Sequence, residues 1–162
     1  MADRYNTSPD KSSPSVEKKP LAASQFRMLL LDVKNRLLAD DGLGAANAYN
    51  EHRRAHPDWT LEEPDLKALI RALHEQKLWS ASIRSMADYV RCYPDQAVRM
   101  RFRLAEILIS VERKPRKAIE VLEKLDLASL PADLRETRQK LLTKAESIKS
   151  ACELEMADGE DW

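Results

Sequence analysis

Three of the eight prolines divide this chain at equal intervals: Pro57, Pro94 and Pro131 each follow the previous one by 37 residues. The first two stand in the matching contexts HPD and YPD, and the third in LPA. A fixed period of this length is typical of a repeat array, in which similar structural units stack one after another. Because repeat arrays usually present a surface to a partner, the period favours a binding role.

The segments between these prolines have a helical pattern. Apolar residues recur at steps of three and four, as at Leu66, Leu69 and Leu73, which is typical of amphipathic helices. The three glycines in the chain are too few for a turn-rich β-sandwich, and they form no Gly-rich phosphate loop. Thr60 is predicted to cap the third helix. We expect seven helices, over residues 23–39, 43–56, 63–76, 79–92, 96–111, 115–126 and 132–152.

The chain is therefore predicted to be all-α, with three antiparallel helical hairpins and a C-terminal capping helix, because short loops join antiparallel neighbours. This domain covers residues 23–152. Residues 1–22 are rich in Ser, Pro and Lys and are expected to form a disordered tail, and residues 153–162 an acidic tail. Two isolated cysteines, and no apolar run long enough for a signal peptide or a membrane span, predict a cytoplasmic protein. Peripheral association through a partner stays open.

Several positions match a known repeat pattern. The matching residues are Leu66, Leu69, Leu73, Trp79, Ser82, Met86 and Val90 in the unit 63–96; Leu104, Ala105, Leu108, Ala118 and Leu122 in the unit 97–131; and Ala45 and Tyr49 in the unit 26–58. Through these residues, the region 25–152 resembles the tetratricopeptide repeat. The resemblance implies a right-handed stack of helical hairpins. Ile70 stands where that family usually has Gly or Ala, so the two helices of its unit are expected to pack less closely.

The resemblance also implies that the first helices of successive units line a concave groove. Helical spacing places a basic, partly apolar set of residues on that face: Lys67, Arg71, Arg99, Phe102, Arg103 and Ile109. An arginine can hold a carboxylate through two parallel hydrogen bonds, and the apolar members would add contact area. The predicted function is a non-catalytic protein–protein interaction module, an adaptor or assembly scaffold, that binds an acidic peptide or helix of a partner.

Other functions have weaker support in the sequence. The main alternative is a self-associating structural component, with the first hairpin or the last helix as its interface. The balance of 27 basic and 27 acidic residues argues against a nucleic-acid partner. His52 and His56 have a spacing that suits a metal, but Arg53 and Arg54 beside them would repel a cation; a polar outer face of this helix is the alternative. No catalytic motif and no cofactor are predicted, so an enzyme or a small-molecule-binding domain is less favoured.

Overall fold

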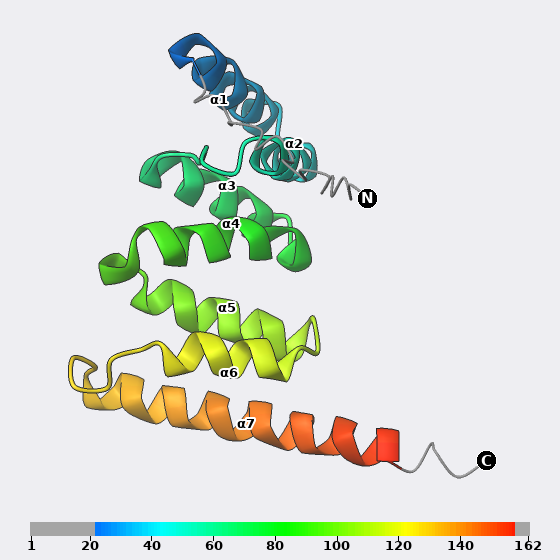
Figure 1. The fold of residues 1–162 in the computed structure, drawn as a ribbon, viewed down its shortest axis with the longest axis vertical. Helices are drawn as coiled ribbons and strands as arrows, with labels where there is room; N and C mark the ends of the chain where they lie inside the picture. The colour runs from blue at the N-terminus through cyan, green and yellow to red at the C-terminus, as the bar shows by residue number, and fades with distance from the viewer. Residues whose placement is uncertain (1–21, 158–162) are drawn as a thin grey trace, which may run out of the picture.

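The computed structural model describes residues 22–157, and in that range the chain is all-α, as predicted (Figure 1). The elements are α1 (Ala23–Leu38), α2 (Gly42–Ala55), α3 (Glu63–Glu75), α4 (Trp79–Cys92), the short 3₁₀ helix η1 (Pro94–Gln96), α5 (Val98–Ser110), α6 (Pro115–Glu123) and α7 (Ala132–Ala157). α7 continues to Ala157, five residues beyond the predicted end of the last helix. The remainder of the two predicted tails, residues 1–21 and 158–162, lies outside the described residues.

The helices are stacked in chain order along the long axis of the molecule, and successive helices of the stack run in opposite directions (Figure 1). Contacts join α1 to α2, α3 to α4 and α5 to α6, while α7 packs against both α6 and α5. The three evenly spaced prolines lie in the linkers between these pairs: Pro57 follows α2, Pro94 begins η1 after α4, and Pro131 directly precedes α7. The proline period therefore marks the boundaries between pairs of helices.

A second repeated feature is the way in which the first helix of each pair ends. Asp40, Lys77 and Arg113, which follow α1, α3 and α5, have positive φ angles of 57°, 58° and 54°. The amide after each of them donates to a carbonyl near the end of the helix: Asp41 to Arg36 (2.9 Å), Leu78 to Leu73 (2.8 Å) and Lys114 to Leu108 (2.8 Å). A left-handed residue here is a common helix ending, but glycine usually occupies the position. The first two pairs thus share one turn geometry without glycine, and the turn after α5 is a version one residue longer.

The core runs the length of the stack. The leucines that carry the helical periodicity are buried, among them Leu66, Leu69 and Leu73 of α3 and Leu104 of α5. Near the first pair of helices, the buried ring of Trp59 lies 5.7 Å from that of Tyr49 and 6.0 Å from that of Phe26. Burial of these apolar side chains is the main favourable term in holding successive pairs together.

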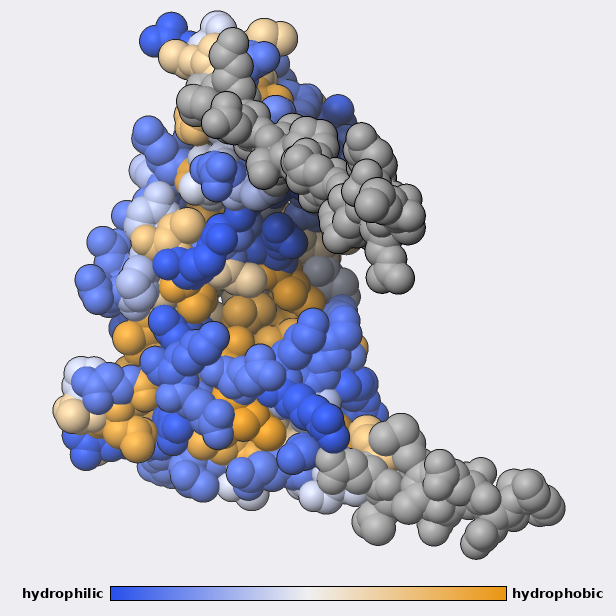
Figure 2. All heavy atoms as spheres, in the orientation of Figure 1, coloured by the Kyte–Doolittle hydropathy of each residue, from blue (hydrophilic) through white to orange (hydrophobic). Residues whose placement is uncertain are grey.

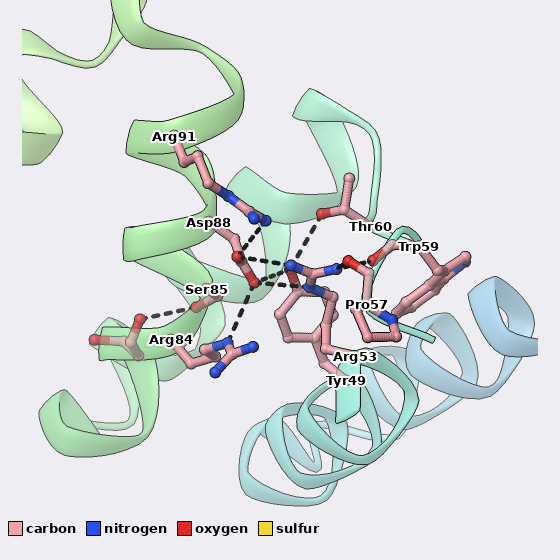
Figure 3. A network of polar contacts seen from close by, with 10 residues as sticks. Tyr49, Arg53, Pro57, Trp59, Thr60, Arg84, Ser85, Asp88 and Arg91 are labelled. Atoms are coloured by element: carbon pink, nitrogen blue, oxygen red, sulfur yellow. Dashed lines mark hydrogen bonds and ion pairs between the residues drawn. The ribbon is translucent and has the colours of Figure 1, made fainter. Parts of the chain in front are cut away.

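A buried polar cluster joins the first pair of helices to the second (Figure 3). Asp88 of α4 accepts hydrogen bonds from Nε and Nη2 of Arg53 on α2, both at 3.1 Å, and from the Tyr49 hydroxyl at 2.8 Å. Arg53 also donates to the backbone carbonyls of Pro57 and Trp59. The Arg53 and Asp88 side chains are only 3% and 7% exposed. Charges are tolerated at this depth because each one is paired and hydrogen-bonded.

Two local predictions in this region are corrected. The helix that contains Arg53 was considered either a metal site or a polar outer face. The Arg53 guanidinium is instead buried, because it pairs with the carboxylate of Asp88. Thr60 does not cap α3, whose N-cap is Glu62. The Thr60 hydroxyl instead lies 3.2 Å from the hydroxyl of Tyr49, and so belongs to the polar cluster (Figure 3).

Candidate functional site

An open hollow of about 530 Å³ lies on one face of α3 and reaches α5. We call it the α3 hollow. It is lined by Lys67, Ile70, Arg71, His74 and Glu75 of α3 and by Met100 of α5. The α3 residues share a face because they are three and four positions apart. Met100 gives the hollow an accessible apolar part between charged neighbours. Ile70, the residue that departs from the small residue of the repeat pattern, is only 4% exposed and belongs mainly to the core.

Of the two cations in the α3 hollow, Lys67 already has an ion-pair partner and Arg71 has none within 4 Å in the described part of the chain. The Lys67 ammonium lies 2.6 Å from Glu63 and 5.6 Å from the centroid of the Tyr89 ring. The hydrogen bond with Glu63, followed by that with Tyr89, raises the pKa of Lys67. Arg71 is exposed, and within the described part of the chain no carboxylate lies within 4 Å of its guanidinium. Arg71 is therefore available for an incoming anion.

A second hollow of about 450 Å³ adjoins the first, and we call it the α5 hollow. Its lining comes from the start of α4, from α5 with the residue after it, and from α7: Trp79, Arg103, Glu106, Ile107, Ser110, Val111, Leu141 and Lys144. The Arg103 guanidinium lies 4.9 Å from the centroid of the Trp79 ring and pairs with Glu106 at 2.9 Å. Arginine over an indole face is a favourable cation–π arrangement. Figure 2 shows that one face of the stack has recessed apolar atoms bordered by hydrophilic residues.

His74 connects the two hollows. It lines the α3 hollow, and its ring lies 5.0 Å from that of Trp79 in the α5 hollow. Its Nε2 atom lies 3.1 Å from the Ser82 hydroxyl. Burial, and then the charge of Arg103, lower the pKa of His74 below its usual value. A neutral imidazole is thus favoured between the two hollows.

The predicted groove residues are divided by the structure. Lys67 and Arg71 line the α3 hollow and Arg103 lines the α5 hollow, while Arg99 is exposed on α5 and lines neither. Phe102 and Ile109 are 7% and 0% exposed, so the prediction that they offer apolar contact to a partner is wrong. They are buried because α5 packs against α4, α6 and α7 together, which leaves only a narrow outward stripe on this helix.

The apolar and aromatic part of the surface was not predicted from the sequence. Met100 is the accessible apolar residue in the α3 hollow, since Ile70 is itself only 4% exposed. Trp79 was assigned a packing role, whereas it also lines the α5 hollow under Arg103. The spacing of residues 67, 70, 71 and 74 along one helical face was a signal that could have identified the α3 side.

A third hollow, of about 370 Å³, is strongly basic. It is lined by Arg113, Lys114, Pro115, Arg116 and Lys117 at the start of α6 and by Lys149 and Cys152 near the end of α7. We call it the α6 pocket. Five of these residues form the run RKPRK in the sequence. Because it is more basic than the α3 hollow and lies at a different place, the α6 pocket provides a control for general attraction of acidic ligands.

No protein-family model matches this chain, and no curated protein or solved structure matches it either. In the described range, no group of three or more His, Cys, Asp or Glu side chains is placed to hold a metal ion. None of the described helices combines the length and the apolar character that crossing a bilayer requires. Function must therefore be argued from the surface itself.

Proposed function

We propose that this chain is a non-catalytic protein-interaction module, an adaptor or assembly scaffold, that binds an acidic segment of a partner in the α3 hollow. The observation that carries the proposal is Arg71: an exposed guanidinium with no carboxylate within 4 Å among the described residues, in a hollow that the apolar Met100 also lines. Such a combination suits a ligand that has an acidic side chain next to an apolar one.

The chemistry of the hollow supports this kind of ligand. Arg71 can accept a carboxylate in a bidentate geometry, which gives orientation as well as attraction. Lys67 is already paired with Glu63, so we expect it to contribute to the electrostatic potential of the hollow and not to form a new ion pair with the ligand. Met100 is unbranched and adaptable, and it would cover an apolar side chain of the ligand. Arg103 over Trp79 would extend the same recognition into the α5 hollow.

The pairwise arrangement of helices supports a tetratricopeptide-like, right-handed stack as the framework for this surface. The prolines between pairs and the left-handed endings at Asp40, Lys77 and Arg113 both repeat along the chain, as expected for similar units. We further propose that the protein acts in the cytoplasm. Cys92 and Cys152 are exposed and unpaired, which suits a reducing compartment.

Selection from a random peptide display library tests the proposal directly. Peptides that bind the native chain should be enriched in Asp or Glu next to a large apolar residue. The same selection against Arg71→Glu should lose these peptides. For a selected peptide, Arg71→Ala should weaken binding about 10- to 100-fold, because a charged hydrogen-bonded pair contributes roughly 1.5–3 kcal/mol.

The α6 pocket supplies the matched control. Lys117→Glu changes the net charge as Arg71→Glu does, but at another surface, so binding of the selected peptides should be almost unchanged. Circular dichroism would show that both variants fold. Peptides that bind Arg71→Glu as well as the native chain would contradict the proposal. Loss of binding in Lys117→Glu alone would place the ligand site in the α6 pocket instead.

A further inference from the structure

α1 has two apolar faces, of which only one is covered. Val33 is fully buried, and Leu30 and Leu37 pack against the same core. On the opposite side, Met28 and Leu31 are 68% and 54% exposed, and the next apolar residue on that side, Leu38, is 85% exposed. α1 is the first helix of the stack and contacts α2 and α3. Its outer side is therefore uncovered by the rest of the described chain.

The exposed face of α1 has the spacing of a coiled coil. Its residues are Ser24, Met28, Leu31, Asn35 and Leu38, at alternating steps of four and three. This is the a/d pattern of a heptad repeat, with Met28 and Asn35 at a positions and the other three at d positions. A single Asn at an a position is a typical determinant of two-stranded pairing, since the two carboxamides can meet across the seam.

The charges that flank this seam agree with a parallel pair of α1 helices. Arg27 lies at a g position and Asp32 at the following e position, and these two positions meet between the helices of a parallel coiled coil. The Asp32 carboxylate already accepts from Arg36 at 3.0 Å and lies 2.9 Å from His52, so it is held in place. An antiparallel pair would instead set Asn35 against Leu31 and bring two Asp32 side chains together.

The geometry of the stack leaves room for this pairing. α1 lies at one end of the molecule, and the other helices extend away from it (Figure 1). A two-fold axis parallel to α1 would place two stacks end to end. The chain's own residues 1–21 are a poor alternative cover, because their sequence is mostly polar and no apolar pattern at steps of three and four continues beyond Tyr5.

We propose that α1 pairs with α1 of a second copy of this chain as a short parallel coiled coil, with Met28, Leu31 and Leu38 as its apolar contacts and Asn35 setting its register. One helix per subunit makes a small interface, so the dimer forms weakly and reversibly. Two copies joined in this way would carry two α3 hollows, and would bind a bivalent partner more tightly than either hollow alone.

Sedimentation velocity of the full chain, from low micromolar to several hundred micromolar, tests the pairing. The native chain should shift from monomer to dimer with concentration. Leu31→Glu/Leu38→Glu should remain monomeric throughout, with an unchanged circular dichroism spectrum. The matched control is Val111→Glu/Leu127→Glu, which charges two apolar residues that are 45% and 49% exposed elsewhere. This control should dimerise as the native chain does.

Disulfide trapping tests the direction of the pair. In a background of Cys92→Ser and Cys152→Ser, Ser24→Cys should cross-link two copies under mild oxidation, because equivalent d positions meet in a parallel pair within disulfide range. A native chain that stays monomeric at all concentrations would overturn the proposal, as would a dimer that persists in Leu31→Glu/Leu38→Glu. If Leu31→Glu/Leu38→Glu abolishes the dimer but Ser24→Cys gives no cross-link, the parallel arrangement is overturned. None of these outcomes depends on peptide binding, so the dimer and the α3 hollow can fail separately.

Discussion

Removal of the Asp88 carboxylate should weaken the junction between the first two pairs of helices. In the structure this carboxylate accepts two hydrogen bonds from Arg53, one from Tyr49 and one from Arg91. The Arg53 side chain is almost completely buried. The Asp88→Ala variant would leave its guanidinium without a counter-charge where water scarcely reaches, and breaking a buried ion pair in this way typically costs about 3–5 kcal/mol.

The value expected here is at the lower end of that range, about 3 kcal/mol of the free energy of unfolding. Arg53 keeps its hydrogen bonds to the carbonyls of Pro57 and Trp59, and Tyr49 keeps Thr60 as a neighbour, so neither group is left wholly unpaired. Replacing both partners, as in Arg53→Met/Asp88→Leu, should recover most of the loss, because an apolar pair of similar volume carries no desolvation cost. Arg84→Ala is the control: this exposed arginine lies 3.6 Å from Asp88, and its loss should cost about 0.5 kcal/mol or less.

Urea unfolding measures these differences, and hydrogen exchange locates them. Because the cluster joins α2 to α4, Asp88→Ala should first expose the amides of α1 and α2, while those of α5 and α6 stay protected. The reasoning would be refuted by a loss below about 1 kcal/mol. It would also fail if the double variant were as unstable as Asp88→Ala, since the cost would then not come from an unpaired charge.

The same cluster predicts a dependence on pH. Burial alone would raise the pKa of Asp88, but the hydrogen bonds from Arg53 and Tyr49 outweigh it and hold the pKa below 3.8. A carboxyl with a lowered pKa in the folded state stabilises the fold at neutral pH, and this contribution disappears as the pH falls through that pKa. The difference in stability between the native chain and Asp88→Asn should therefore shrink below about pH 3.8.

Three further predictions concern the turns, the core and the histidine between the hollows. Lys77→Gly should raise the free energy of unfolding by about 0.5–1 kcal/mol in urea titrations, because Lys77 has a left-handed backbone that favours glycine; an unchanged midpoint would contradict this. Leu104→Ala should cost about 2–5 kcal/mol, against about 0.5 kcal/mol or less for the half-exposed Leu127→Ala; equal losses would show that the buried face has been misplaced. The pKa of His74 is lowered in the folded chain, first by burial. The unfolded chain therefore takes up a proton at higher pH than the folded chain, and the free energy of unfolding should fall as the pH drops below about 6.5. Between neutral and mildly acidic pH, the melting temperature should fall less for His74→Gln than for the native chain. An equal fall in the two proteins would exclude His74 as the source of the pH dependence.

Most of the helical framework could be predicted from the sequence. The steps of three and four that locate the helices are set by the burial of residues such as Leu66 and Leu69, and the prolines stand where helices cannot continue. The turn geometry could not be predicted, since Asp40, Lys77 and Arg113 occupy left-handed positions that sequence patterns associate with glycine.

The candidate surface was predicted only in part, for two physical reasons. Periodicity identifies one face of a single helix, but the number of neighbours decides how much of its circumference is buried. α5 has α4, α6 and α7 around it, which explains why Phe102 and Ile109 are inside. The second reason is that partners such as Arg53 and Asp88 are 35 residues apart, and no local pattern connects them.

The two ends of the stack differ in a way that bears on assembly. A stacked array needs a polar outer face at each end if it is to remain a monomer. α7 has such charged positions, including Glu136 and Lys140, which form an exposed ion pair at 2.6 Å. α1 instead exposes Leu31 and Leu38 at the other end. If the apolar ends join around a two-fold axis, the charged ends remain outside and no further copy can add. The difference between α1 and α7 thus favours a closed dimer over a filament.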